Sequence, residues 1–157
     1  MLMEVIMTIK EFIEKAGIKG AILGVDYGAR RIGLSLSDPR REFTFPAGQI
    51  DNQDITSSAL KIKELIEEKK VSGVVIGYPI QLDGTESEQC KVIKNFAEVL
   101  LNQFSVPIFF QDERLSSKGA QTMLRELKLT RKRRDAIDDE VAACNILKTA
   151  LDLLKTL

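Results

Sequence analysis

Three acidic residues occupy positions from which they could bind a metal ion together. Asp26 and Glu113 end two apolar runs, 21–27 and 106–113, that are typical of strands, and Asp139 opens the last expected helix. The carboxyl ends of parallel strands and the neighbouring helix starts form the usual ligand crevice of a sheet. Carboxylates that converge there repel one another unless a cation neutralises them. Mg²⁺ takes oxygen ligands, so the three acids predict a metal site.

The chain contains no histidine. This excludes Ser-His-Asp and Cys-His nucleophilic sites, zinc bound by histidine and a histidine general base. The two cysteines, Cys90 and Cys144, lie far apart without a CxxC partner, and we interpret them as buried thiols in helices. Any hydrolysis therefore depends on carboxylates, Lys, Tyr or a metal held by oxygen ligands.

Each acid also has a structural interpretation. Among 23 acidic residues, an adjacent pair such as Asp112 and Glu113 arises readily by chance. Asp138 could be an ordinary helix N-cap, and Asp139 could favour the helix dipole from the first turn. A purely structural role explains Asp26 least well, because Asp26 follows the apolar run ILGV, where the pattern of a strand predicts a buried residue. Asp26 is the strongest functional candidate of the set.

Small side chains surround Asp26 in the expected hairpin. Gly24 and Asp26 share one face of the first strand, and Gly33, Ser35 and Ser37 share one face of the second, because side chains alternate. An even number of loop residues would make the two small faces coincide. Asp26 would then lie over an uncrowded, polar floor where a ligand could approach.

The chain has 23 basic and 23 acidic residues and a pI near 6.4. It is therefore not a protein that binds nucleic acid through an overall positive charge. The charges are nevertheless uneven, since the stretch 128–134, KLTRKRR, carries five positive charges and no acid. Such a run is either a solvated loop or a contact to a phosphate backbone. The candidate nucleic-acid contacts are Arg30, Arg31, Arg114, Arg131, Lys132, Arg133 and Arg134.

Hydrophobic periodicity and capping residues predict a one-domain α/β protein. The expected strands are 21–27, 31–37, 43–50, 72–79 and 106–113. The expected helices are 8–17, 54–69, 85–103, 116–127 and 137–155. Pro46 favours an edge position for the third strand. An antiparallel meander followed by β-α-β-α units implies one mixed sheet with helices on both faces.

The segment 77–89, GYPIQLDGTESEQ, joins a buried strand to the next helix. Thr85 and Glu88 have the spacing of a capping box. The backbone N–H groups of this segment could bind a phosphate, or it could be a connecting loop whose Glu86 and Glu88 serve the helix dipole. No P-loop, GxGxxG or GxSxG motif is present.

Four stretches carry a family resemblance: LGVDYGARRIGLSLSD, VVIGYPIQLDGTESEQ, FFQDERLSS and DDEVAACNIL. In order and spacing they resemble the signature blocks of the YqgF (RuvX-like) family, described as Holliday-junction resolvases or as nucleases that mature the 5′ end of pre-16S rRNA. The match spans about residues 21–150. It implies an RNase H-like fold, with three antiparallel strands leading into two parallel ones. Residues 1–20 are then a helical extension and residues 21–157 a single nuclease domain.

The resemblance also implies an acidic triad that binds Mg²⁺ or Mn²⁺. The family's first-strand Asp falls on Asp26, and the Glu of its DER block falls on Glu113. The Asp three residues before the small pair of the last helix falls on Asp139, with Asp138 as the alternative if the register shifts by one. The chain departs from the family pattern at Gly119, where many members have Glu, at Tyr78, where Gly-Leu-Pro is commoner, and in the helix before residue 20, and none of these departures touches the acids.

The leading hypothesis is metal-assisted hydrolysis of phosphodiester bonds, and the resemblance implies processing of the 5′ end of pre-16S rRNA. The alternatives are a Holliday-junction resolvase acting on branched DNA and a non-catalytic module that binds RNA or ribosomes. A nucleotide-binding module of the actin and sugar-kinase type would need a second lobe, for which 157 residues leave no room. Without a membrane span of about 20 apolar residues or a signal peptide, we expect a cytoplasmic protein, either a monomer or a weak homodimer.

Overall fold

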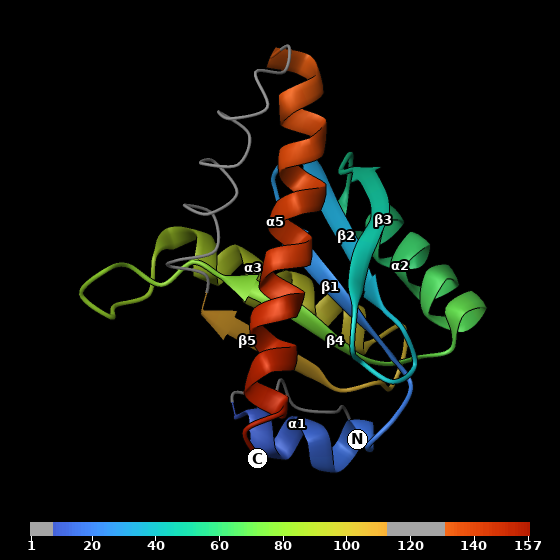
Figure 1. The fold of residues 1–157 in the computed structure, drawn as a ribbon. Coiled ribbons are helices and arrows are strands. Elements are labelled where there is room, and N and C mark those ends of the chain that lie inside the picture. The colour runs from blue at the N-terminus through green and yellow to red at the C-terminus, as the bar shows by residue number, and fades with distance from the viewer. Residues whose placement is uncertain (1–7, 113–130) are drawn as a thin grey trace.

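Figure 1 shows the computed structural model, which describes residues 8–112 and 131–157, with side chains in the second range from residue 139 onward. The strands are Ala21–Tyr27 (β1), Arg31–Ser37 (β2), Thr44–Asp51 (β3), Val71–Tyr78 (β4) and Ile108–Asp112 (β5). The helices are Ile9–Ala16 (α1), Ile55–Lys69 (α2), Glu88–Leu101 (α3) and Arg131–Leu154 (α5). The expected α/β order is confirmed, and the helix expected over 116–127 lies outside the described residues.

The five strands form one mixed sheet in the order β3-β2-β1-β4-β5. β1, β2 and β3 pair antiparallel, whereas β4 pairs parallel with both β1 and β5. This confirms the meander and the two parallel strands, and it places β3 with Pro46 at an edge. β5 is separated from β1 by β4, so any residue that follows β5 must reach across one strand to meet Asp26.

Helices cover both faces of the sheet (Figure 1). α2 and α3 pack against one face, where the core includes Val25, Ile62 and Phe96. α5 and α1 pack against the other face, where the core includes Ile22 and Leu147. Because successive strand residues point to opposite faces, a strand covered on both sides is mostly apolar, as β1 and β4 are apart from Asp26 and Ser72.

Polar side chains fix where the helices begin. The hydroxyl of Thr8 accepts a hydrogen bond from Glu11 N at the start of α1, as predicted. The predicted start of α3 at Thr85 is wrong, because Ser87 is the N-cap and accepts from Cys90 N. The Thr85 hydroxyl lies instead 2.6 Å from Asp83 Oδ1, where it closes the preceding turn.

α5 begins at Arg131, six residues before the predicted start at 137. The stretch taken for a basic loop is therefore helical from 131, because it holds good helix formers and no Gly or Pro. Asp138 and Asp139 lie in the third turn of α5, so the N-cap and first-turn explanations for these two acids are wrong. Neither α5 nor any other helix in the described part of the chain is long and apolar enough to span a membrane.

Arg41 ties α1 to the turn that follows β2. Its side chain is 6% exposed, and its guanidinium donates to Gly17 O at 2.7 Å, Gly20 O at 2.9 Å and Ala16 O at 3.4 Å. The last carbonyls of a helix have no partners within the helix. Arg41 supplies the missing donors and so holds the helical segment against the sheet.

Replacement of Arg41 by Ala is expected to lower the free energy of unfolding by about 1–3 kcal/mol, because carbonyl oxygens that are mostly part-buried lose their donors. Arg40 is exposed, and Arg40→Ala is the matched control, with an expected change within about 0.5 kcal/mol. Urea denaturation followed by circular dichroism measures both. Equal midpoints for the two variants would show that Arg41 does not anchor α1.

Candidate active site

Asp26 lies near the end of β1 and is half-buried. Its Cα partner on β2 is Gly33, and Gly24 pairs with Ser35. Four residues separate the pair Tyr27 and Ile32. The number is even, so the two small faces coincide, an outcome that the sequence had left conditional on the loop. Alternation from Ile22 places Asp26 on the sheet face that α5 covers.

The small residues near Asp26 bring α5 onto the sheet, so the prediction of an open floor is wrong. A Cβ atom at Gly24 would lie 2.8 Å from Leu147 Cβ and 2.9 Å from Ala143 O. The buried hydroxyl of Ser35 donates to Ala143 O at 2.7 Å. Without larger side chains between them, the helix backbone approaches the strands to contact distance.

Asp139 meets β2 at the glycine that pairs with Asp26. A Cβ atom at Gly33 would overlap the main-chain carbonyl of Asp139 and would lie 3.0 Å from its Cβ. Paired residues in an antiparallel sheet have Cα atoms about 5 Å apart. Asp26 and Asp139 therefore flank the same residue, one beside it in the sheet and one above it on α5. The tertiary structure brings these two predicted site residues together.

Asp139 forms an ion pair with Arg31, the first residue of β2. Arg31 Nε lies 2.9 Å from Asp139 Oδ2, and the two side chains are 35% and 21% exposed. Arg31 shares the α5 face with Gly33, two residues further along β2. Arg30, the neighbouring candidate on the hairpin turn, is exposed. The two arginines therefore have different surroundings, although the sequence placed them in one group.

Gln111 is a buried polar residue beside the candidate site, and the sequence analysis did not name it. It is 5% exposed on the α5 face of β5, and its Oε1 has no hydrogen-bond donor among the described residues. Gly77 of β4 pairs with Gln111 of β5. Ile76, which precedes Gly77, pairs with Val25 of β1, so Gly77 lies beside Asp26. Asp26, Gly77 and Gln111 therefore form a row across three strands. The signal in the sequence was a polar residue within the otherwise apolar run of β5.

The donor atoms in this region suit a hard cation. Asp26 and Asp139 offer carboxylate oxygens, and Gln111 offers a buried amide oxygen, which are the ligand types that Mg²⁺ prefers. Within residues 8–112 and 131–157, no three His, Cys, Asp or Glu side chains gather as a metal site. The third predicted ligand, Glu113, lies outside the described residues, as do the side chain of Asp138 and those of Arg114 and residues 131–134.

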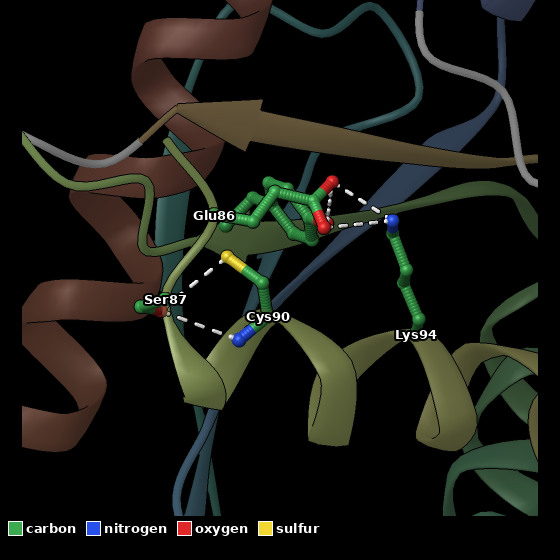
Figure 2. A network of polar contacts seen from close by, with 5 residues as sticks. Glu86, Ser87, Cys90 and Lys94 are labelled. Carbon is green, nitrogen blue, oxygen red and sulfur yellow. Dashed lines mark hydrogen bonds and ion pairs between the residues drawn. The ribbon is translucent and has the colours of Figure 1, made fainter. Parts of the chain in front are cut away.

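A polar network fixes the loop that follows β4 (Figure 2). Tyr78 is 1% exposed, stacks on Phe110 with 4.6 Å between ring centroids, and donates to Glu86 Oε1 at 2.8 Å. Lys94 Nζ lies 2.8 Å from the same oxygen. Burial and then the bond to Glu86 raise the pKa of Tyr78, so Tyr78 is a neutral hydrogen-bond donor at physiological pH. The network holds the loop against α3.

The Lys94 ammonium, followed by the Tyr78 hydroxyl, lowers the pKa of Glu86. The ionised carboxylate therefore stabilises the fold above the ordinary Glu pKa of about 4.3, and that contribution is lost as the pH falls through the lowered folded value. Lys94→Met is expected to reduce the shift of the urea midpoint between about pH 6 and about pH 3. Lys91→Met, which removes an exposed partner of Glu88, is the control and should change the shift less. An unaltered shift in Lys94→Met would contradict this assignment.

Sequence comparison relates the chain to described proteins over nearly its whole length. The family model described as "RuvX: Holliday junction resolvase" matches residues 20–153. A protein of Orientia tsutsugamushi (strain Ikeda) named "Putative pre-16S rRNA nuclease" is 41% identical over 149 residues, which cover 94% of this chain and 93% of that protein. A protein of Rickettsia peacockii (strain Rustic) with the same name is 35% identical over 153 residues, covering 98% and 99%.

Solved structures show the same fold at low sequence identity. Thermus thermophilus RuvC in complex with a Holliday junction substrate has a TM-score of 0.54 at 13% identity, covering 87% of this chain and 96% of that one. The fowlpox virus resolvase in complex with Holliday junction DNA has a TM-score of 0.54 at 10% identity, covering 85% and 98%. The chain thus has a RuvC-like, RNase H-like fold.

Proposed function

This chain belongs to the RuvX family, and we propose that it is a metal-dependent nuclease that hydrolyses phosphodiester bonds and processes the 5′ end of pre-16S rRNA. The observation that supports this most is the meeting of Asp26 and Asp139 at Gly33, far apart in sequence and together in the fold. The similarity to the Orientia and Rickettsia proteins, which extends over nearly the full chain, supports precursor rRNA as the substrate.

Asp26, Glu113 and Asp139 are the proposed metal ligands. Adjacent helix residues point about 100° apart, and the main-chain contact of Asp139 with Gly33 favours Asp139 over Asp138 as the ligand from α5. When bound, Mg²⁺ or Mn²⁺ would lower the pKa of a water molecule and stabilise charge on the phosphate and leaving oxygens. With no histidine in the chain, the protein supplies carboxylates and their placement.

Gln111 is proposed to accept a hydrogen bond within this site. Neighbouring strands lie about 4.8 Å apart, so Asp26 on β1 and Gln111 on β5 are separated by about 10 Å between Cα atoms. Gly77 lies between them in the row and places no side chain in that span. The buried Oε1 of Gln111 would orient a water molecule or a hydroxyl of the substrate.

Basic residues near the acids are proposed to bind the phosphate backbone. Arg30 is exposed on the turn after β1. Residues 131–134 precede Asp139 in the same helix, and five to eight residues of α-helix span about 8–12 Å. Arg114 follows the proposed ligand Glu113 in the sequence. Such contacts give affinity and position, whereas base reading comes from other groups.

The test offers the purified full chain two substrates: precursor 16S rRNA with an extended 5′ end and a four-way DNA junction. Each is incubated with Mg²⁺, Mn²⁺ or EDTA, and the new RNA ends are mapped. We expect metal-dependent cleavage of the RNA near the mature 5′ end and no symmetric cutting of the junction. Cutting of the junction alone would favour a resolvase, and RNA binding without cleavage of either substrate would favour a non-catalytic module.

A further inference from the structure

We propose that Arg31 is a positioning residue that occupies the carboxylate of Asp139 in the metal-free protein, and that a divalent cation exchanges with its guanidinium. This inference rests on the proposed function, since it takes Asp139 as a metal ligand. The contact that carries it is the 2.9 Å ion pair between Arg31 Nε and Asp139 Oδ2. Both side chains are partly shielded from solvent, which strengthens the attraction relative to a fully exposed pair.

Arg31 pairs with the acid of the candidate site and not with the acid beside it in the sheet. The cross-strand partner of Arg31 is Asp51 of β3, an exposed acid on the same sheet face. The ion pair nevertheless forms with Asp139 on α5. The close contact between Gly33 and Asp139 brings that carboxylate within reach. The guanidinium thus bridges the start of β2 to the helix that carries the proposed ligand.

Exchange follows from the charges. In the metal-free protein the guanidinium offsets the repulsion that acids gathered at one site impose on one another. A guanidinium stays protonated at every physiological pH, so a metal cation that binds Asp139 meets a positive charge and must displace it. Once displaced, the Arg31 guanidinium would be available to contact a substrate phosphate. Arg31 therefore lowers metal affinity while it stabilises the metal-free fold.

Arg30→Gln and Arg31→Gln form a matched pair of variants. The two variants each remove one positive charge, at adjacent positions of the chain, but only Arg31 pairs with Asp139. We expect metal-free Arg31→Gln to bind Mn²⁺ about three- to tenfold more tightly than the parent. The gain is modest because a partly exposed ion pair is weak, and it includes the loss of repulsion between the guanidinium and the metal cation. We also expect Arg31→Gln to unfold at a lower temperature in EDTA, with Arg30→Gln close to the parent in both measurements.

Titration calorimetry with Mn²⁺ and thermal unfolding in EDTA on the full chain test the inference. Mn²⁺ affinity and EDTA stability that are equal in the two glutamine variants would overturn it, as would weaker Mn²⁺ binding by Arg31→Gln. Arg31→Lys keeps the charge and is expected to change Mn²⁺ affinity less than Arg31→Gln, so an equal gain would also overturn it. In EDTA, Arg31→Gln combined with Asp139→Asn should be no less stable than Asp139→Asn alone.

A further variant separates failure of this inference from failure of the proposed function. Asp26→Asn is expected to lose most Mn²⁺ binding, because it removes a different proposed ligand. If Asp26→Asn binds Mn²⁺ as the parent does, the proposed metal site is wrong and the exchange is wrong with it. If Asp26→Asn loses Mn²⁺ while Arg31→Gln matches Arg30→Gln, the metal site stands and the role of Arg31 alone is overturned.

Discussion

Asp26→Asn is expected to reduce Mg²⁺-dependent cleavage of precursor rRNA by about 100-fold or more while the protein stays folded. Loss of a residue that merely supports a metal ligand costs about 10–100-fold, so loss of a charged ligand should cost at least as much. Asn has the same shape as Asp, and Asp26 is half-buried at the end of β1. The substitution therefore removes charge without disturbing packing.

The control for this experiment is Asp152→Asn, which removes an exposed carboxylate near the other end of α5. It should cleave at the parent's rate. Thermal unfolding of both variants checks that the fold is intact, and gel-shift measurements in EDTA check that RNA binding survives. Cleavage by Asp26→Asn at the parent's rate would show that Asp26 is not a catalytic residue, whatever the effect of substitutions at the other acids.

Gly33→Ala is expected to impair both stability and cleavage, because the new methyl group has no space. Its Cβ would overlap the main-chain carbonyl of Asp139, so the helix backbone must move. Overpacking of this kind typically costs about 1–3 kcal/mol in the free energy of unfolding. A displacement of about 1 Å at a catalytic group can cost about 100-fold in rate. We therefore expect a loss of cleavage at temperatures where the variant is still fully folded.

Gly48→Ala is the control for loss of a glycine without loss of a helix contact. Gly48 lies on β3 with φ of +93°, and a Cβ there would meet nothing within 4 Å. It should lose about 1 kcal/mol of stability through its backbone conformation and retain parent-like cleavage. Urea denaturation and cleavage of precursor rRNA are measured on both variants. If Gly33→Ala matches the parent in both, α5 does not rest on β2 in the way described.

The sequence alone predicted the elements whose signals are local. Apolar runs marked all five strands, and Pro46 indicated the edge position of β3. Because strand side chains alternate with period two, the sequence predicted that the small faces of the two strands coincide if the loop after Tyr27 is even, and the observed register supplies that parity. Together with the four family blocks, these signals were enough to predict the RNase H-like fold and the position of Asp26 at the end of β1.

The boundaries that were wrong had competing local signals. Thr85 and Ser87 both satisfy the composition of an N-cap, and the contact of Thr85 with Asp83 decided between them. The basic stretch before α5 contains helix formers that could equally belong to a charged loop. Only the continuous helix from Arg131 showed that Asp139 has no capping role.

The tertiary structure alone decided how the site is assembled. The contact of Ser35 with Ala143 joins residues 108 positions apart, and the ion pair of Arg31 with Asp139 joins the start of β2 to α5. In the sequence Gln111 is one polar residue within an apolar run, and only the fold shows it as a buried acceptor in the row across the sheet. Local periodicity tells which face a residue takes, but the partner on that face depends on how closely a distant helix packs there. At Gly24 and Gly33, that closeness comes from the absence of side chains.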